Sequence, residues 1–144
     1  MPRGSEGGRG VATESGSKRV SASREDYLEA IVELGGTPKR PIRPVDVASK
    51  LGVSKASVTK AVASLKEAGM LDQPYYGDIT LTSDGYEYGS KVLERHTMLY
   101  EFLHDVLGVP AERADDEACL IEHDISDSTA EAWIAYMRNA KRAK

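Results

Sequence analysis

Residues 44–69 contain two short amphipathic segments separated by a tight turn, and this arrangement constrains the fold more than any other feature of the chain. Pro44 stands where the first segment begins, since the first helical position does not need an N–H, and Gly52 follows its end. Ser54 can cap the second segment, and Gly69 follows that one. The apolar residues of the second segment recur at helical spacing: Val58, Ala61, Val62 and Leu65. The pattern predicts a helix-turn-helix.

Helices and a small hairpin are predicted around this unit. The stretch "SREDYLEAIVEL" predicts a helix that Ser23 caps and that Gly35 and Gly36 end. The stretch "LDQPYYGDITLT" predicts two short strands joined at residues 76–78, which form a β-wing. Further helices are predicted at about residues 84–107, 110–124 and 127–142. The expected fold class is therefore mainly α, with a winged helix-turn-helix followed by a helical domain.

Composition and length exclude several classes of protein. The chain has 144 residues, of which 40% are hydrophobic, and this suits one domain or two small units that share a core. No apolar run reaches the length of about 18 residues that a membrane span requires. Its single cysteine cannot form an internal disulfide, and the N-terminus has no apolar secretion signal. A cytoplasmic protein is expected.

Charge is strongly segregated along the chain. Residues 39–66 hold seven basic side chains and one acidic, whereas residues 67–137 hold sixteen acidic and three basic. A local basic patch on a helix-turn-helix predicts binding to double-stranded DNA, although a protein-binding winged helix is the alternative. The second helix places its N-terminal side chains at the bases of the major groove. The candidate DNA-binding residues are Arg43, Ser54, Lys55, Ala56, Ser57, Thr59, Lys60 and, on the wing, Tyr76.

The stretch "EACLIEH" indicates a metal site. Cys119, Glu122 and His123 are spaced i, i+3 and i+4, so a helix places them on one face. One soft donor and two harder ones suit a first-row divalent ion. Further candidate ligands on other helices are His96, Asp26 and Glu29. Singly, each has a simpler explanation: Cys119 as a small core residue, for example, and Asp26 as part of a capping box.

These segments together resemble the diphtheria-toxin-repressor family of metal-dependent transcriptional repressors, including its manganese-regulator branch. The resemblance covers about residues 22–140. It rests on "SREDYLEAI", "VASKLGVSKASVTKAVASLKEAGML", "LTSDGYEYG" leading into "ERHTMLYEFL", and "DDEACLIEHDIS". It implies a winged helix-turn-helix DNA-binding domain at residues 21–83 and a helical metal-binding and dimerisation domain at residues 84–144. Residues 1–20 are rich in glycine, serine and charge without periodicity, which predicts a disordered tail.

The resemblance also implies a ligand set. Asp26 and Glu29 match carboxylates of the manganese branch, Cys119 matches the iron branch, and the remaining matches are shared by both: His96, Glu122 and His123. A thiolate favours Fe²⁺, Co²⁺ or Zn²⁺, whereas carboxylates favour Mn²⁺, so Mn²⁺ or Fe²⁺ is expected in cells and Co²⁺ or Zn²⁺ can bind in vitro. The iron branch has an ancillary site whose positions here are Tyr100 and Asp115, and these two residues do not match it.

The expected function is a homodimeric repressor that binds a palindromic operator when metal is bound and controls metal-homeostasis genes. Two alternatives remain open. The first is a winged-helix regulator that responds to oxidation of Cys119 or to an organic ligand. The second is a metallohydrolase, against which the sequence has neither a separate nucleophile nor a glycine-rich substrate loop. A protein without enzymatic activity is expected.

Overall fold

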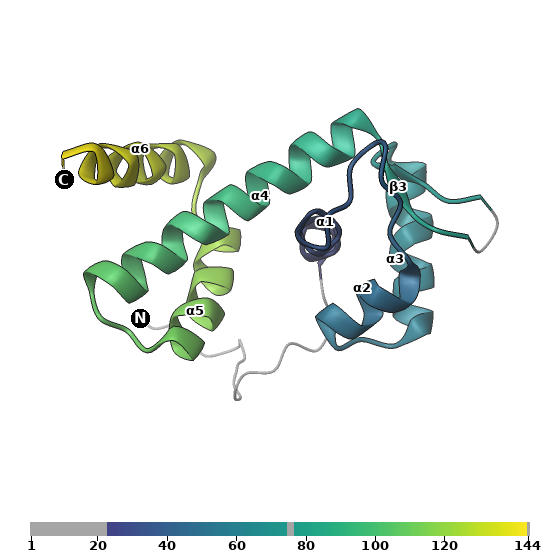
Figure 1. Cartoon of the computed structure of the whole chain (residues 1–144), viewed down its shortest axis with the longest axis horizontal. Coiled ribbons are helices and arrows are strands. Elements are labelled where there is room, and N and C mark those ends of the chain that lie inside the picture. The colour runs from purple at the N-terminus through teal and green to yellow at the C-terminus, as the bar shows by residue number, and fades with distance from the viewer. Residues whose placement is uncertain (1–22, 75–76, 144) are drawn as a thin grey trace.

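The computed structural model describes residues 23–74 and 77–143 (Figure 1). The tail predicted at residues 1–20 and the predicted wing residue Tyr76 lie outside the described residues. The elements are α1 (Arg24–Glu33), α2 (Pro44–Leu51), α3 (Lys55–Glu67), β2 (Leu71–Asp72), β3 (Thr80–Leu81), α4 (Ser83–Glu101), the π-helical turn η1 (Phe102–Val106), α5 (Ala111–Asp124) and α6 (Asp127–Ala143). The predicted mainly α fold class is confirmed. Each helix in the described part of the chain is too short or too polar to cross a bilayer.

α4 is a long diagonal helix that joins the two ends of the molecule (Figure 1). At one end α1, α2, α3 and the β2–β3 hairpin form a unit that we call the head, and at the other end α4 packs with α5 and α6. β2 and β3 are antiparallel, with Leu71 opposite Leu81. The chain just before α2 joins this hairpin through a bridge between Ile42 and Ile79. The boundary predicted between residues 83 and 84 remains a prediction.

The head has its own hydrophobic core. Ile31, Val47 and Ile79 are each 0% exposed, and they lie on α1, on α2 and just before β3. They pack in one cluster with apolar residues of α3. Burial of each such side chain contributes about 1.5–3 kcal/mol relative to its exposed state. α1 is therefore part of the core of the head as well as a neighbour of α4.

Local sequence signals define the ends of the helices that carry the candidate site. Ser23 and Asp26 form a reciprocal capping box at α1: the Asp26 amide donates to Ser23 Oγ at 3.1 Å and the Ser23 amide to Asp26 Oδ2 at 2.9 Å. Gly52 ends α2 at φ +66°, a left-handed conformation that glycine adopts without strain. Gly89 lies where α4 crosses α1, and a Cβ there would be 2.9 Å from the Leu28 carbonyl oxygen. A glycine thus permits the close approach of these two helices.

The helix predicted at residues 84–107 is not continuous. α4 ends at Glu101, and the chain widens into the π-helical turn η1, closed by a hydrogen bond from the Leu107 amide to the Phe102 carbonyl at 3.1 Å. Hydrophobic periodicity does not distinguish such a turn from an α-helix. In η1, Leu103 is buried and His104 Nδ1 lies 2.8 Å from the Val109 carbonyl oxygen. The turn therefore joins α4 to α5 while it keeps the core of this end filled.

Candidate metal centre and DNA-facing surface

The six predicted ligands lie in two neighbouring groups between the head and the far end of the molecule. α1 contributes two carboxylates, α4 one histidine, and α5 the remaining three side chains. The ligand atoms within each group lie within 4.8 Å of one another. The first group is Asp26, Cys119 and His123, and the second is Glu29, His96 and Glu122. The three candidate ligands on one face of α5 are thus divided between the groups, with Cys119 and His123 in the first and Glu122 in the second.

The first group brings α1 and α5 together. Asp26 Oδ1 lies 3.2 Å from His123 Nε2 and 3.9 Å from Cys119 Sγ. Asp26 is only 4% exposed, and its other oxygen accepts the capping hydrogen bond from Ser23. The two explanations of Asp26 are therefore compatible, because one carboxylate oxygen caps α1 and the other faces the thiol and the imidazole.

The second group is more deeply buried. His96 Nδ1 lies 2.8 Å from Glu122 Oε1 and 4.0 Å from Glu29 Oε2. Glu122 is 1% exposed, and its Oε2 has no hydrogen-bond partner within the described part of the chain. The same oxygen is 3.9 Å from His123 Nε2, so it lies between the two groups. A buried carboxylate oxygen without a donor is costly unless a positive charge is close to it.

Protons occupy this acidic cluster in the absence of metal. Burial, followed by the charge of Glu122, raises the pKa of Glu29 to about 8. Burial opposes the imidazolium form of His96, but hydrogen bonds to Glu122 and Asp115 outweigh it and raise its pKa to about 10. Hydrogen bonds to Asp26 and Cys119 raise the pKa of His123 to about 11. Two imidazolium groups therefore offset part of the negative charge at neutral pH.

The donors fit a divalent cation. The first group has a thiol, a carboxylate and an imidazole, and the second has two carboxylates and an imidazole. Thiolates and imidazoles suit Fe²⁺, Co²⁺ and Zn²⁺, whereas carboxylates suit Mn²⁺. The oxygen of Glu122 that lacks a donor lies where a cation would satisfy it. A cavity of about 390 Å³ is lined by residues of both groups and by Lys50 of α2.

The predicted DNA-binding residues of α3 lie on an exposed face of the head. These are Ser54, Lys55, Ala56, Ser57, Thr59 and Lys60. All three hydroxyls of this set make local hydrogen bonds. Ser54 Oγ accepts from the Ser57 amide at 3.1 Å and donates to Ser57 Oγ at 3.0 Å, and Thr59 Oγ1 donates to the Lys55 carbonyl at 3.0 Å. Arg43, which precedes α2, pairs with Asp46 at 3.1 Å on the surface. The pair has two parallel hydrogen bonds, but the Arg43 side chain is still 66% exposed, so its free face remains accessible to another anion.

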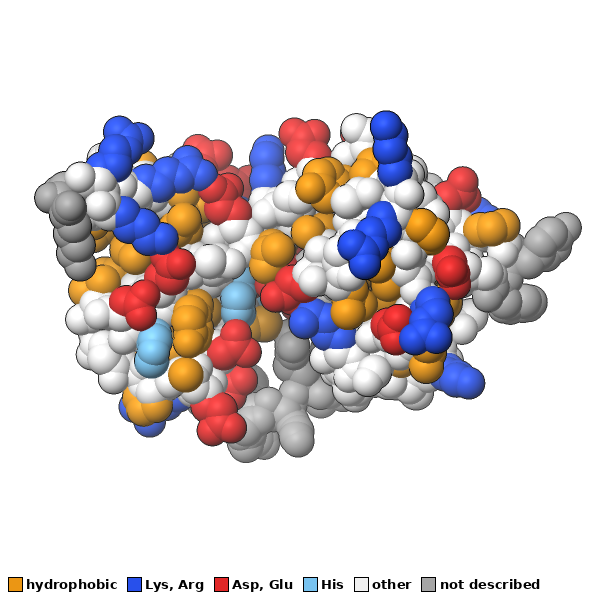
Figure 2. Space-filling view, in the orientation of Figure 1, with side chains coloured by type: hydrophobic (Ala, Val, Ile, Leu, Met, Phe, Trp, Pro, Cys, Tyr) orange, Lys and Arg blue, Asp and Glu red, His pale blue; other side chains and the backbone are white. Residues whose placement is uncertain are grey.

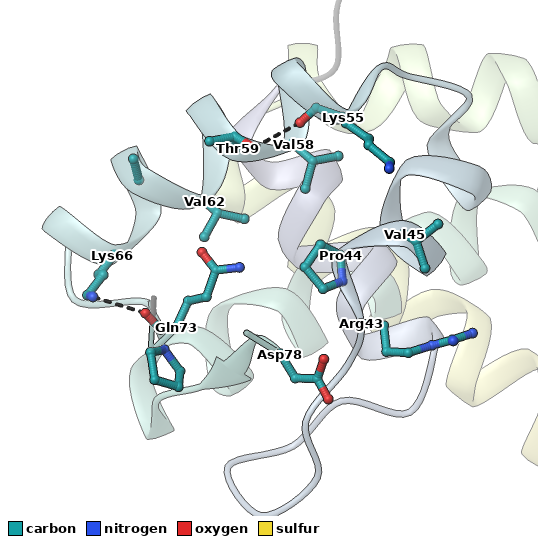
Figure 3. Close-up of a pocket in the computed structure, with 12 residues that line it drawn as sticks. Arg43, Pro44, Val45, Lys55, Val58, Thr59, Val62, Lys66, Gln73 and Asp78 are labelled. Atoms are coloured by element: carbon teal, nitrogen blue, oxygen red, sulfur yellow. Dashed lines mark hydrogen bonds between the residues drawn. The ribbon is translucent and has the colours of Figure 1, made fainter. Parts of the chain in front are cut away.

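A groove of about 920 Å³ runs between α3, the start of α2 and the β2–β3 hairpin (Figure 3). Basic side chains line it together with apolar ones, and Lys66 donates to the Gln73 carbonyl at 3.1 Å. In Figure 2 basic side chains lie over the head and over α6, and many of the acidic ones lie between them. The charge segregation of the sequence therefore persists on the surface of the molecule.

Comparison with protein families accounts for both halves of the chain. Residues 19–78 match the N-terminal DNA-binding domain of iron-dependent repressors, and residues 82–143 match their metal-binding and dimerisation domain. The chain belongs to the iron-dependent repressor family. Members of this family are metal-dependent transcriptional regulators and not enzymes, so the resemblance to diphtheria-toxin repressors is confirmed and the metallohydrolase alternative is excluded.

Two curated relatives illustrate how much of the family the chain covers. An uncharacterized HTH-type transcriptional regulator of Methanocaldococcus jannaschii is 36% identical over 123 residues, which cover 85% of this chain and 98% of the relative. The transcriptional regulator MntR of Salmonella typhimurium is 34% identical over 116 residues, which cover 78% of this chain and 70% of MntR. The family assignment thus extends over both the DNA-binding and the metal-binding regions.

Solved structures of the family have the same fold. A manganese-dependent transcriptional repressor in complex with manganese is 28% identical with a TM-score of 0.69, over 80% of this chain and 52% of that one. ScaR with bound Zn²⁺ is 27% identical with a TM-score of 0.65, over 81% of this chain and 54% of that one. The chain therefore spans about half the length of these solved repressors.

Three contacts to the candidate ligands of this repressor were not predicted from the sequence, in which Asp115 appeared only as an unmatched position of the iron-branch ancillary site. His123 Nδ1 lies 2.8 Å from Glu25 Oε1, and His96 Nε2 lies 2.8 Å from Asp115 Oδ1. Arg95 donates to the backbone carbonyl of Glu122 at 3.0 Å. Asp115 could have been found, because it is four residues before Cys119 on the same helix face. The other two contacts depend on how α1 and α4 pack against α5, and the sequence pattern does not indicate this.

Proposed function

We propose that this family member is a repressor whose DNA binding is switched on by Mn²⁺ or Fe²⁺. The proposed ligands are Asp26, Glu29, His96, Cys119, Glu122 and His123, and Co²⁺ and Zn²⁺ are expected to bind in vitro. The observation that carries the proposal is the buried Oε2 of Glu122, which lies between the two groups of candidate ligands and has no hydrogen-bond donor among the residues that the structure describes. A bound divalent cation would supply positive charge to these carboxylates in place of the protons that His96 and His123 carry without metal.

The ligands come from both ends of the molecule, which supports a switch. Asp26 and Glu29 project from α1, whose other face belongs to the core of the head. Cys119, Glu122 and His123 project from α5 at the far end. When these side chains bind a common ion or pair of ions, they fix α1 against α5 and so fix the head on the rest of the chain. A shift from about 1% to 99% active protein requires a preference of about 10⁴-fold for the active state.

Binding to a palindromic operator requires two heads in a defined geometry. We infer a homodimer in the cytoplasm whose two α3 helices lie about 34 Å apart, which is one turn of DNA. Exposed apolar side chains support self-association at the far end, where Leu120 of α5 is 60% exposed and Leu107 beside η1 is 59% exposed. The operator contacts are proposed for Arg43, the exposed face of α3 and Tyr76 of the wing.

Titration with Co²⁺ tests whether metal binds and whether the thiol is a ligand. We expect metal-stripped protein to show saturable d–d absorption bands together with a thiolate-to-metal charge-transfer band. The Cys119→Ser variant should keep the d–d bands and lose the charge-transfer band, since a carboxylate and an imidazole of the first group remain. Absence of any band in the unmodified protein would contradict the metal centre and leave Cys119 oxidation or an organic ligand as the signal.

Metal affinity is expected to rise with pH. His96 and His123 have pKa values of about 10 and 11 without metal, and that of Glu29 is about 8, so all three carry a proton at neutral pH that a metal ion must displace. The apparent affinity should therefore increase about tenfold per pH unit for each proton released, up to those pKa values. Isothermal titration with Mn²⁺ from about pH 6 to pH 8, in buffers of different ionisation enthalpy, gives the affinity and the proton count. Equal affinity throughout this range would contradict the protonated cluster.

Lys60→Ala separates DNA binding from metal binding. Lys60 lies on the exposed face of α3, away from both ligand groups, and an ammonium group there is suited to a phosphate contact. We expect weaker binding to all DNA sequences, a salt-dependence slope reduced by about 1, and unchanged Co²⁺ affinity. Fluorescence anisotropy at several salt concentrations measures the first two. Glu67→Ala at the end of α3 is the control, and an equal loss of affinity in that variant would contradict a specific role for Lys60.

A further inference from the structure

Each histidine of the candidate metal centre contacts a second carboxylate. The contact is made by the ring nitrogen that does not face the ligand group, which we call the outer nitrogen. His123 directs Nε2 towards Asp26 and has Glu25 Oε1 2.8 Å from Nδ1. His96 directs Nδ1 towards Glu122 and has Asp115 Oδ1 2.8 Å from Nε2. Neither Glu25 nor Asp115 belongs to the two ligand groups.

The pairing matters because an imidazole can bind metal only through a nitrogen that carries no proton. A carboxylate on one ring nitrogen keeps the remaining proton there and leaves the other nitrogen free to bind. The geometry assigns Glu25 and Asp115 as positioning residues, which select the metal-binding nitrogen of His123 and His96 and hold each ring towards its ligand group. This inference rests on the proposed metal-dependent function and adds to it the residues that orient the histidines.

Glu25 is held from two sides. Its Oε1 accepts from His123 of α5, and its Oε2 accepts from the Tyr88 hydroxyl of α4 at 2.8 Å. Both oxygens are therefore occupied, and the side chain is 33% exposed. For Glu25 to bind metal itself, it would have to weaken or give up at least one of these hydrogen bonds. Its geometry instead suits a support that fixes the His123 ring relative to three helices.

Asp115 performs the equivalent role from a more exposed position. It lies on α5 four residues before Cys119, and its side chain is 66% exposed, whereas that of His96 is 14% exposed. A hydrogen bond at the surface constrains its partner less than a buried one, because water competes for both groups. We therefore expect loss of Asp115 to have a smaller effect than loss of Glu25.

The test is NMR of protein with ¹⁵N-labelled histidine, loaded with ¹¹³Cd²⁺. In the unmodified protein, coupling to cadmium should appear at Nε2 of His123 and at Nδ1 of His96. Glu25→Ala should lower cadmium affinity about 10–100-fold and abolish the fixed assignment of Nε2 in His123. Glu25→Gln keeps an oxygen acceptor, and it should restore the Nε2 assignment and most of the affinity. These nitrogen assignments would not change if Glu25 only stabilised the fold.

Matched controls remove a charge without touching a histidine. Glu33→Ala acts on the same helix as Glu25, at a side chain that pairs with Lys50 at 3.5 Å. Asp116→Ala acts beside Asp115, in the wall of the same cavity. Both variants should keep both nitrogen assignments and lose less affinity than Glu25→Ala. A comparable loss in the controls would show a general charge effect and would overturn the inference.

Two further outcomes would overturn the inference, and a third would remove its basis. If Glu25→Ala and Asp115→Ala keep both affinity and nitrogen assignments, the outer carboxylates do not position the rings. If Asp115→Ala loses one equivalent of cadmium while His96 stays coupled through Nδ1, Asp115 is itself a ligand. If neither histidine couples to cadmium in the unmodified protein, the proposed metal centre fails together with the inference.

Discussion

Glu122→Gln is expected to abolish the metal response of DNA binding while the protein stays folded. The amide has nearly the same shape as the carboxylate, but it has no charge at a position that is 1% exposed and lies between both ligand groups. Loss of a residue that only hydrogen-bonds to a metal ligand typically lowers metal affinity about 10–100-fold. Loss of the proposed ligand Glu122 itself should therefore lower it by more than about 100-fold. Operator binding measured by anisotropy with and without Mn²⁺, alongside Co²⁺ titration, checks the prediction.

A matched substitution on the same helix serves as the control for this result. Glu117→Gln removes one charge from an exposed position of α5 and should leave the metal response unchanged. The metal-free Glu122→Gln protein should be somewhat less stable than the unmodified protein, because an amide oxygen makes a weaker hydrogen bond to the His96 imidazolium than the carboxylate does. A variant that still needs metal to bind its operator, with unchanged affinity for metal, would contradict the proposed site.

Ile31→Ala should cause a large loss of stability. Ile31 is 0% exposed on α1 and belongs to the core cluster of the head, so its truncation leaves a cavity and should cost about 2–5 kcal/mol of unfolding free energy. Urea unfolding of the metal-free protein, followed by circular dichroism, measures the loss. Val45→Ala is the control, because Val45 is 48% exposed and its truncation should change stability by no more than about 0.5 kcal/mol.

Metal should partly restore the stability of the Ile31→Ala protein. A ligand that binds only the folded state stabilises it by about 2.7 kcal/mol when its free concentration is 100 times Kd. Repeating the unfolding with Mn²⁺ at that ratio measures the gain for the variant and for the unmodified protein. A metal that binds but gives neither protein any added stability would contradict a centre formed from side chains of three helices.

The fold was predictable from the sequence because its helices have clear local signals. Ser23, Pro44 and Gly52 lie at helix ends in the structure, at the positions that the sequence predicted. The exception was the helix predicted at residues 84–107, whose last part is the π-helical turn η1. An apolar pattern in the sequence reports which face of a helix is buried, and it does not report a change from i→i+4 to i→i+5 hydrogen bonds.

The candidate site was only partly predictable. The spacing of Cys119, Glu122 and His123 placed them on one helix, but their division between two groups depends on where α1 and α4 lie. In the sequence Glu25 is an ordinary surface acid and Asp115 is an unmatched position of the iron-branch ancillary site. Only the packing of three helices brings them to the outer nitrogens of two histidines. Sequence spacing reports neighbours on one helix, whereas contacts between helices depend on the whole fold.

α1 has two roles, in core packing and in the candidate metal centre, and a change to one affects the other. Its apolar side chains complete the core of the head, and the Asp26 carboxylate both caps its first turn and faces the thiol and imidazole of α5. A change in the position of that first turn therefore also moves a proposed metal ligand. A substitution anywhere in the core of the head that loosens α1 should raise the metal concentration at which the repressor responds. The metal concentration at which the repressor responds should thus depend on hydrophobic packing in the head as well as on the metal ligands.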